Sequence, residues 1–207
     1  MASKRDISNF CLGKKIIIVG NSSRILQDSY GSLIDNYELV VRINRGYHPN
    51  NLYRSHLGGK TNILSLGVKS QTFATRIIGG NHIPYILCPI IYSDRLGYSN
   101  AYHTDKEEYH DLKNKLDGIK PSTGIATFNF FNKLNNFDRL DIIGFDFFES
   151  SGPHRNQLGH LRVPDHNGHK EKIFFKETRD PERSLLHPMP AGGTPHNNIP
   201  KITPYRR

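Results

Sequence analysis

The chain has 207 residues, and its 28 Lys and Arg against 19 Asp and Glu give a net charge of +9 at neutral pH. With 10 Tyr and 11 Phe it has enough aromatic side chains for a hydrophobic core, which excludes wholesale disorder. The longest apolar stretch, residues 83–92, is interrupted by Pro84 and Pro89 and is far shorter than the roughly 20 residues of a membrane-spanning helix.

The first residues and the cysteines indicate where the chain works. Residues 1–15 lack the apolar segment of a secretory signal, so we expect a soluble, cytoplasmic protein without a membrane anchor. The two cysteines, Cys11 and Cys88, are too few for a disulfide framework or a four-cysteine zinc site, which agrees with a reducing compartment.

Short apolar runs alternate with segments of helical periodicity along most of the chain. In chain order, the expected elements are a strand at 14–20, a helix at 25–36, strands at 37–44 and 62–67, a helix at 70–78, a strand at 83–87, helices at 105–116 and 123–135, a strand at 140–145 and a helix from 170 to 176. Residues 89–104 and 146–165 are rich in polar residues and are expected to be loops.

This alternation predicts an α/β protein, a single Rossmann-like three-layer α/β/α domain with a mostly parallel sheet. We place this domain at residues 1–178. Residues 179–207 hold six of the 12 prolines and have no regular period, so we expect an irregular tail or a docking arm there.

Two segments have the residue types of a phosphate-binding site. Gly20, Asn21 and Ser22 follow the first strand, where backbone amides and short polar side chains can hold a phosphate or a ribose. The segment Lys120-Pro-Ser-Thr-Gly124 enters a helix whose N–H groups and dipole attract an anion. The alternative is an ordinary serine-capped turn or helix start. Neither segment has the glycine pattern of a dinucleotide site or a P-loop, which disfavours an oxidoreductase.

Polar and histidine-rich loops begin at Asp146, directly after the last strand at 140–145. Histidines there are candidates for general acid–base chemistry, although a loop histidine is commonly only solvated. A zinc cluster of His154, His160, His166 and His169 lacks the spacing of known zinc motifs. The chain also has no Asp-x-Asp pair, which argues against the manganese-dependent sugar-nucleotide transferases.

Taken in order, these segments resemble the animal-type sialyltransferase family of CMP-sugar-dependent glycosyltransferases. Residues 17–44, ending in Val41-Arg-Ile-Asn44, resemble its large sialylmotif. Residues 121–146 resemble the small sialylmotif, and His166 with Glu171 resembles the very small motif. His56-Leu-Gly-Gly-Lys-Thr-Asn62 resembles the Gly-x-Lys-Thr stretch that follows the large motif. The resemblance covers about residues 14–178.

The resemblance implies a variant nucleotide-sugar glycosyltransferase fold and a metal-independent, inverting transfer from a CMP-sugar to an acceptor hydroxyl. The residues that it implies for the donor are Asn21, Asn44, Ser122, Thr123 and Gly124, and those for catalysis are His166 as the base and His154 near the donor phosphate, with His160 as its rival. Lys120 would stabilise the leaving phosphate, and Asp146 and Glu171 would support the site, Glu171 by orienting or capping.

The sequence departs from the animal enzymes in ways that favour a short bacterial or viral relative. Ile16 stands where they carry a cysteine of a disulfide, and we expect no counterpart of their N-terminal membrane anchor. The acceptor is expected to be a glycan or, given the positive charge, modified DNA. The basic residues concentrated early in the chain are Lys4, Arg5, Lys14, Lys15, Arg42, Arg45, Arg54 and Lys60, and the alternative is a merely solvated basic face.

A non-catalytic nucleotide or nucleic-acid binding module on the same fold is the main alternative function. Such a module would keep Asn21, Asn44 and Ser122 but would not need His166. The donor sugar, the linkage and the oligomeric state do not follow from the sequence.

Overall fold

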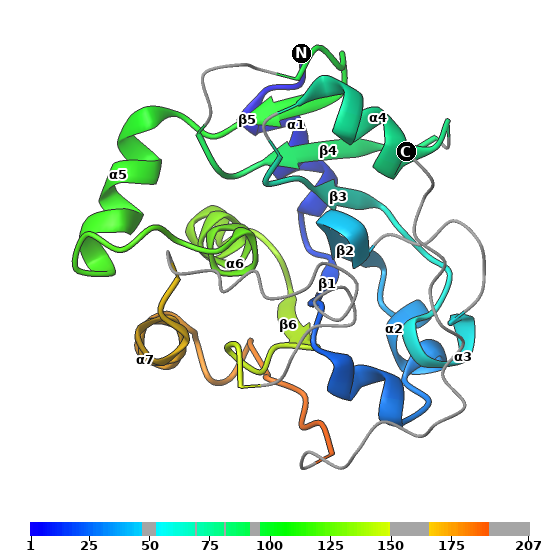
Figure 1. Ribbon diagram of the computed structural model, residues 1–207. Helices are drawn as coiled ribbons and strands as arrows, with labels where there is room; N and C mark the ends of the chain where they lie inside the picture. Colours follow the sequence, from blue (N-terminus) through cyan, green and yellow to red (C-terminus); the bar gives the residue numbers. More distant parts are fainter. Residues whose placement is uncertain (47–52, 69, 81, 92–95, 150–165, 191–207) are drawn as a thin grey trace.

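The computed structural model describes residues 1–46, 53–68, 70–80, 82–91, 96–149 and 166–190 (Figure 1). Within them the chain forms one six-stranded sheet in the order β5-β4-β3-β2-β1-β6. Every neighbouring pair is parallel, so the expected α/β fold with a parallel sheet is confirmed. The strands are β1 (Lys15–Val19), β2 (Leu39–Ile43), β3 (Ile63–Ser65), β4 (Tyr85–Cys88), β5 (Ala101–His103) and β6 (Arg139–Ile143).

The strand order reverses next to β1. From β1 the chain builds outward through β2, β3, β4 and β5, and it then returns to place β6 on the other side of β1. In open α/β sheets, ligands bind beyond the carboxyl ends of the strands at such a switch point. The fold therefore directs attention to the loops that follow β1 and β6.

Helices cover both faces of the sheet, as a parallel sheet requires. One face packs against α1 (Lys4–Cys11), α5 (Lys106–Lys115), α6 (Thr123–Leu134) and α7 (Gly168–Thr178). The other packs against η1 (Ser23–Gln27), α2 (Gly31–Asp35), α3 (Arg54–Leu57) and α4 (Gln71–Ile78). Residues of β1 alternate between the two cores, with Ile16 and Ile18 on the α6 side and Ile17 and Val19 on the other.

Helix α6 is the helix that the core fixes most firmly. Its Phe128 is fully buried and meets Phe175 of α7 edge-on, with ring centroids 4.8 Å apart. Thr127, also fully buried, shares a hydrogen bond of 2.6 Å with the Ser65 hydroxyl at the end of β3. These contacts hold the N-terminus of α6 over the carboxyl ends of the central strands.

Several elements differ from the sequence-based expectation. The helix expected at 25–36 is two short helices, η1 and α2, because Asp28 and Ser29 form a turn in which the Asp28 carboxylate accepts from the Ser29 N–H. The strand β5 lies inside the expected loop 89–104, and α1 and α3 were not expected. Both α1 and α3 are short. The sequence feature that could have predicted α1 is its capping box between Ser3 and Asp6.

The C-terminal arm, by which we mean residues 179–190, runs along the outer edge of β6. The N–H groups of Leu140 and Ile142 donate to the carbonyls of Arg183 and Leu185, each at 2.9 Å. The His187 N–H donates back to the Ile142 carbonyl, also at 2.9 Å. The arm is therefore hydrogen-bonded to the domain along this edge. The proposed domain boundary at residue 178 stays a prediction.

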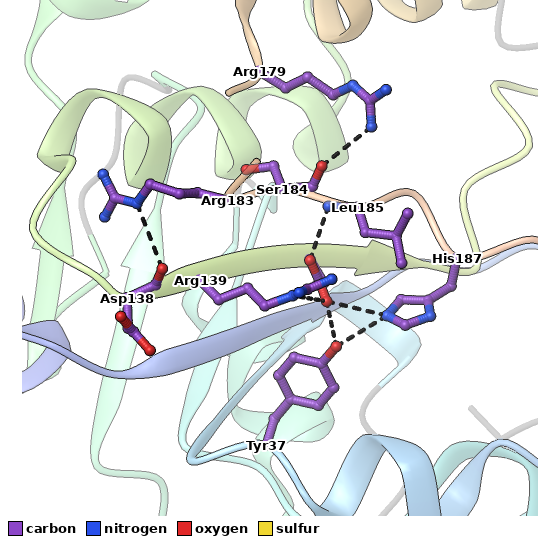
Figure 2. Close-up of polar contacts among 9 residues, drawn as sticks. Tyr37, Asp138, Arg139, Arg179, Arg183, Ser184, Leu185 and His187 are labelled. Carbon is purple, nitrogen blue, oxygen red and sulfur yellow. Dashed lines mark hydrogen bonds and ion pairs between the residues drawn. The ribbon is translucent and has the colours of Figure 1, made fainter. Parts of the chain in front are cut away.

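A buried carboxylate fastens this arm. Asp141 of β6 is fully buried, and it accepts hydrogen bonds from the Leu185 N–H (2.8 Å), Arg139 Nε (2.8 Å), the Tyr37 hydroxyl and His187 Nε2 (3.3 Å). Figure 2 shows three side chains converging on this carboxylate: Arg139 from β6, His187 from the arm and Tyr37 from the segment before β2. Burial raises the pKa of Asp141, but these hydrogen bonds lower it further, to about 2.

Candidate active site at the carboxyl ends of the strands

The loops after β1 and β6 are tied together directly. The Gly20 N–H donates to the Ile143 carbonyl (2.7 Å) and the Ser22 N–H to the Gly144 carbonyl (3.0 Å). A Cβ atom at Gly20 would overlap the Gly144 carbonyl, and Gly144 itself has φ of +75°. The glycine at position 20 is thus required by the close approach of two protein backbones.

Ser22 and Asp146 join the same two loops through their side chains. The Ser22 hydroxyl donates to Asp146 Oδ2 (2.9 Å) and accepts from the Arg24 N–H (3.2 Å), so it caps η1. The other carboxylate oxygen, Asp146 Oδ1, accepts from the Phe148 N–H (3.2 Å). Ser22 is buried, with 5% of its surface exposed, and its observed contacts give it a structural part in shaping the loops.

The two asparagines of the large motif lie at adjacent strand ends. Asn21 Nδ2 donates to the Ile43 carbonyl at 3.1 Å. Asn44 accepts from the Gly67 N–H through Oδ1 (2.7 Å) and donates through Nδ2 to Thr123 Oγ1 (3.2 Å). Its φ of +47° is a left-handed value that Asn adopts more readily than most residues. Asn44 therefore links the ends of β2 and β3 to the start of α6.

The N-terminus of α6 offers two backbone donors beside Asn44. Ser122 is the N-cap, and its hydroxyl accepts from the Ile125 N–H at 3.2 Å. In the part of the chain that the structure describes, no acceptor engages the N–H groups of Thr123 and Gly124. Together with the helix dipole, such amides form an anion site. The site is bounded by Gly67, where a Cβ would overlap Thr123 Oγ1.

Glu171 of α7 is hydrogen-bonded to the N-cap of α6. Its carboxylate accepts from the Ser122 N–H (2.8 Å) and from the Ser122 hydroxyl (2.7 Å). Only 3% of Glu171 is exposed, and this burial raises the pKa of its carboxyl to about 7, although the two hydrogen bonds from Ser122 lower it in part. These contacts join Glu171 to the N-cap, and its expected part in orienting or capping stays a prediction.

His166 lies immediately before α7 and is held by the segment that leads into α6. Its Nδ1 is 2.8 Å from the Lys120 carbonyl oxygen. A carbonyl only accepts, so Nδ1 carries the proton, and in the neutral imidazole Nε2 is then the basic nitrogen. Residues 120–122 thus bind His166 through Lys120 and Glu171 through Ser122, which brings the imidazole to the same edge as Thr123 and Asn44.

Phe148 is a member of this site that the sequence analysis missed. Its ring stacks on the His166 imidazole, with centroids 5.7 Å apart and planes 12° from parallel. Phe147 and Phe148 both have positive φ, +51° and +68°, which costs about 1–3 kcal/mol for each such residue. The only signal in the sequence is the aromatic pair itself, directly after Asp146.

His154 and its rival His160 lie outside the described residues, so their parts in the site stay predictions. Among the residues that the structure describes, no group of three or more His, Cys, Asp or Glu side chains is placed to hold a metal ion. Nor is any helix in the described ranges both long and apolar enough to cross a membrane.

The sequence comparison bears on the motif that contains Asn21 and Asn44. The glycosyltransferase family 29 (sialyltransferase) family model matches residues 12–85, which include β1, β2 and β3. This segment of the chain is therefore similar to that family. Among curated proteins, none matches the sequence.

Solved sialyltransferases share the fold. A mammalian sialyltransferase in complex with Gal-β-1-3GalNAc-ortho-nitrophenol superposes with a TM-score of 0.57 and 16% identity, over 87% of this chain and 71% of that one. CstII from Campylobacter jejuni, in complex with the substrate analogue CMP-3FNeuAc, gives 0.52 and 16% over 84% and 80%. A structure of CST-II with a trisaccharide acceptor and CMP gives 0.51 and 18% over 80% and 78%.

These matches confirm the resemblance on which the sequence analysis relied, and they confirm the fold class. Both a mammalian and a bacterial enzyme have the fold, so the expected bacterial or viral source stays a prediction, as does the cytoplasmic location. The roles of the individual site residues belong to the proposal that follows.

Proposed function

We propose that this protein is a sialyltransferase-like enzyme, a metal-independent, inverting glycosyltransferase that moves a sugar from a CMP-sugar to an acceptor hydroxyl. The observation that carries the proposal is that residues 120–122 connect the His166 imidazole to the N-terminus of α6. One end of this segment fixes the His166 imidazole, and the other begins a helix whose Thr123 and Gly124 amides lie beside Asn44. This arrangement supports a base and an anion site at one edge of the sheet.

The donor would bind with its phosphate at the N-terminus of α6. The Thr123 and Gly124 N–H groups and the helix dipole stabilise negative charge there. Lys120, in the preceding segment, adds a cation. Asn21 and Asn44 would hold the nucleotide, as the matching asparagines do in the family that the sequence resembles. This arrangement supports CMP as the leaving group, because the charge that develops on its phosphate meets donors that are already in place.

The chemical step would be a single displacement. The acceptor oxygen attacks the anomeric carbon, the bond from that carbon to the phosphate oxygen breaks, and the acceptor proton moves to His166 Nε2. CMP leaves with the electron pair of the broken bond, and the anomeric configuration inverts. General-base assistance of this kind contributes about 10²–10⁴-fold to the rate.

The test compares His166→Ala with His169→Ala, since His169 is an exposed histidine three positions further along. We expect wild-type enzyme and His169→Ala to release CMP from a CMP-sugar at equal rates, and His166→Ala to be about 10²–10⁴-fold slower in kcat. CMP should still stabilise His166→Ala against heat, by about 2.7 kcal/mol at 100 times its Kd.

Full turnover by His166→Ala would overturn the proposed base. Wild-type enzyme that binds CMP but turns over no CMP-sugar, with or without acceptor, would instead support the non-catalytic nucleotide-binding module. Stabilisation by UMP or AMP equal to that by CMP would contradict the choice of donor.

For the acceptor we propose a glycan hydroxyl. The solved relatives with the same fold include one in complex with Gal-β-1-3GalNAc-ortho-nitrophenol and one with a trisaccharide acceptor. Modified DNA, the other expectation from the positive charge, has no support from these relatives.

A further inference from the structure

The turn at residues 146–149 holds an exposed aromatic ring against the proposed base. Phe148 has 39% of its surface exposed, yet its ring lies nearly parallel to the His166 imidazole. A large apolar side chain that stays at the surface while it stacks on a titratable ring is not explained by core packing. Its position beside His166 suggests a part in the chemistry.

The backbone of this turn is locked from several sides. Asp146 accepts from the Phe148 N–H through its carboxylate (3.2 Å) and from the Glu149 N–H through its carbonyl (3.0 Å). Glu149 then pairs with Lys172 of α7 (2.8 Å) and Arg24 of η1 (3.4 Å). A left-handed backbone at two consecutive Phe residues persists only where the surroundings determine it, and such residues cluster at functional sites.

The start of α7 is built around the same turn. A Cβ atom at Gly168 would overlap the Phe147 carbonyl oxygen, so only glycine allows α7 to begin this close to the turn. Since His166 directly precedes the N-cap Asn167, this packing sets the distance between the Phe148 ring and the imidazole. The stacking is therefore a consequence of fixed backbone on both sides.

The stacked ring restrains a different motion of the imidazole from the one that the hydrogen bond to Lys120 restrains. The hydrogen bond fixes the position of Nδ1 but does not itself oppose rocking of the ring plane about the Nδ1–carbonyl direction. A flat ring stacked on one face removes that motion, because rocking would separate the two surfaces. The two contacts together fix both the plane of the imidazole and the direction of Nε2.

We propose that Phe148 is a positioning residue for His166 and keeps Nε2 aimed at the acceptor hydroxyl. The inference rests on the proposed function, in which His166 is the base. It predicts that loss of the flat ring lowers kcat and leaves the KM for the CMP-sugar unchanged, because the donor binds at the N-terminus of α6.

The experiment compares Phe148→Ala, Phe148→Leu, Phe148→Tyr and the control Ile173→Ala, which removes a side chain of similar exposure (40%) from α7. Leu keeps the bulk but not the flat face, and Tyr keeps both. We expect Phe148→Ala and Phe148→Leu to lose about ten- to a hundredfold in kcat, since small misplacements of reacting groups have effects of this size. Phe148→Tyr and Ile173→Ala should remain within about twofold of wild type.

A second readout does not depend on turnover. In protein labelled with ¹⁵N at histidine, NMR should give wild-type His166 as one Nδ1–H tautomer with sharp ring signals. Phe148→Leu should keep this tautomer, because the Lys120 carbonyl still accepts from Nδ1, but motion of the ring should broaden its His166 signals. This measurement holds even if the wild type transfers no sugar, an outcome that would sink the proposed function alone.

Three results would overturn the positioning role. The first is a kcat of Phe148→Leu equal to that of wild type with an unchanged His166 spectrum. The second is a rise in acceptor KM at constant kcat, which would make Phe148 an acceptor contact. The third is equal loss in Phe148→Tyr and Phe148→Leu, which would show that the flat ring is irrelevant.

Discussion

Glu171 is the residue whose ionisation most directly affects the proposed donor site. Its buried carboxyl has a pKa of about 7, and it accepts from the residue that caps α6. Below that pH the group is neutral. Above it, a negative charge lies beneath the same helix N-terminus that is proposed to receive the donor phosphate, and two like charges near one another repel.

We therefore predict that donor affinity falls as the pH rises from about 6 to 8. The measurement is calorimetric binding of CMP-3FNeuAc, the analogue found with the Campylobacter jejuni enzyme. Its phosphodiester does not titrate in this range, unlike the phosphate of CMP. Glu171→Gln should remove most of this pH dependence, whereas Glu177→Gln, which changes an exposed carboxyl on the same helix, should keep it.

The same shift has a consequence for folding. Between about pH 4.5 and 7 the folded state binds a proton at Glu171 that the unfolded state does not, so this contribution to stability is complete below about pH 4.5 and is lost as the pH rises to about 7. The loss amounts to about 3 kcal/mol by linkage. For the binding prediction, a wild-type affinity for CMP-3FNeuAc that does not change between about pH 6 and 8 would contradict the proposed proximity of the Glu171 carboxyl and the donor phosphate.

At the scale of elements, the C-terminal arm completes the sheet. It supplies hydrogen bonds to the outer edge of β6 and places His187 and the Leu185 N–H on the Asp141 carboxylate. Tyr37, which precedes β2, donates to the same carboxylate. An ionised carboxylate with no exposure depends on each of these donors, so the arm, β6 and the start of β2 are energetically linked.

We predict that Tyr37→Phe lowers the free energy of unfolding by about 1.5–3 kcal/mol, the usual worth of a hydrogen bond to a charged group. Urea denaturation at neutral pH provides the measurement. Tyr30→Phe is the matched control, because the Tyr30 hydroxyl also bonds to the arm, at the Pro188 carbonyl (3.2 Å), but through an exposed and uncharged pair. Equal effects of the two substitutions would contradict a special role of Asp141.

The sequence predicts the strands and helices better than it predicts the contacts between them. The strands β1, β2 and β6 follow from apolar runs that end at Gly20, Asn44 and Gly144. Short elements such as α3 and β5 give too few residues for a period to be recognised.

The contacts that define the site join residues far apart in the chain. Asn44 meets Thr123 across 79 positions and Glu171 meets Ser122 across 49. Periodicity carries no information about such partners. The resemblance to a family singled out Asn44, His166 and Glu171, but the sequence analysis did not find that Phe148 stacks on His166. That contact depends on left-handed backbone, which two phenylalanines do not signal.

For the whole molecule, the net charge of +9 is less available to a polyanion than the sequence suggests. Arg42 is 3% exposed, and its guanidinium donates to the carbonyls of Leu57 and Lys60 inside the protein. Lys14 pairs with Glu38, and Lys4 with Glu108. These three of the basic residues near the start of the chain are engaged by groups of the protein itself, which weakens the argument for a nucleic-acid acceptor.

We accordingly predict that transfer to a neutral oligosaccharide changes by less than about threefold between 50 and 200 mM salt, because no phosphate counterions are released on binding. Hydroxymethylated DNA, offered in parallel, should accept little sugar. Efficient transfer to that DNA, with a loss of about 10³-fold or more over the same salt range, would reverse the choice of acceptor.

The pairing of the arm with β6 also bears on how a shortened version of this chain would behave. A fragment that stops at residue 178 would leave the Leu140 and Ile142 amides unpaired on a bare edge strand. Exposed strand edges recruit strands from other molecules, so such a fragment is expected to aggregate edge to edge. At the opposite edge the Ala2 N–H donates to the Ala101 carbonyl of β5 (3.1 Å), so a fusion partner joined directly to the first residue would disturb the other margin of the sheet.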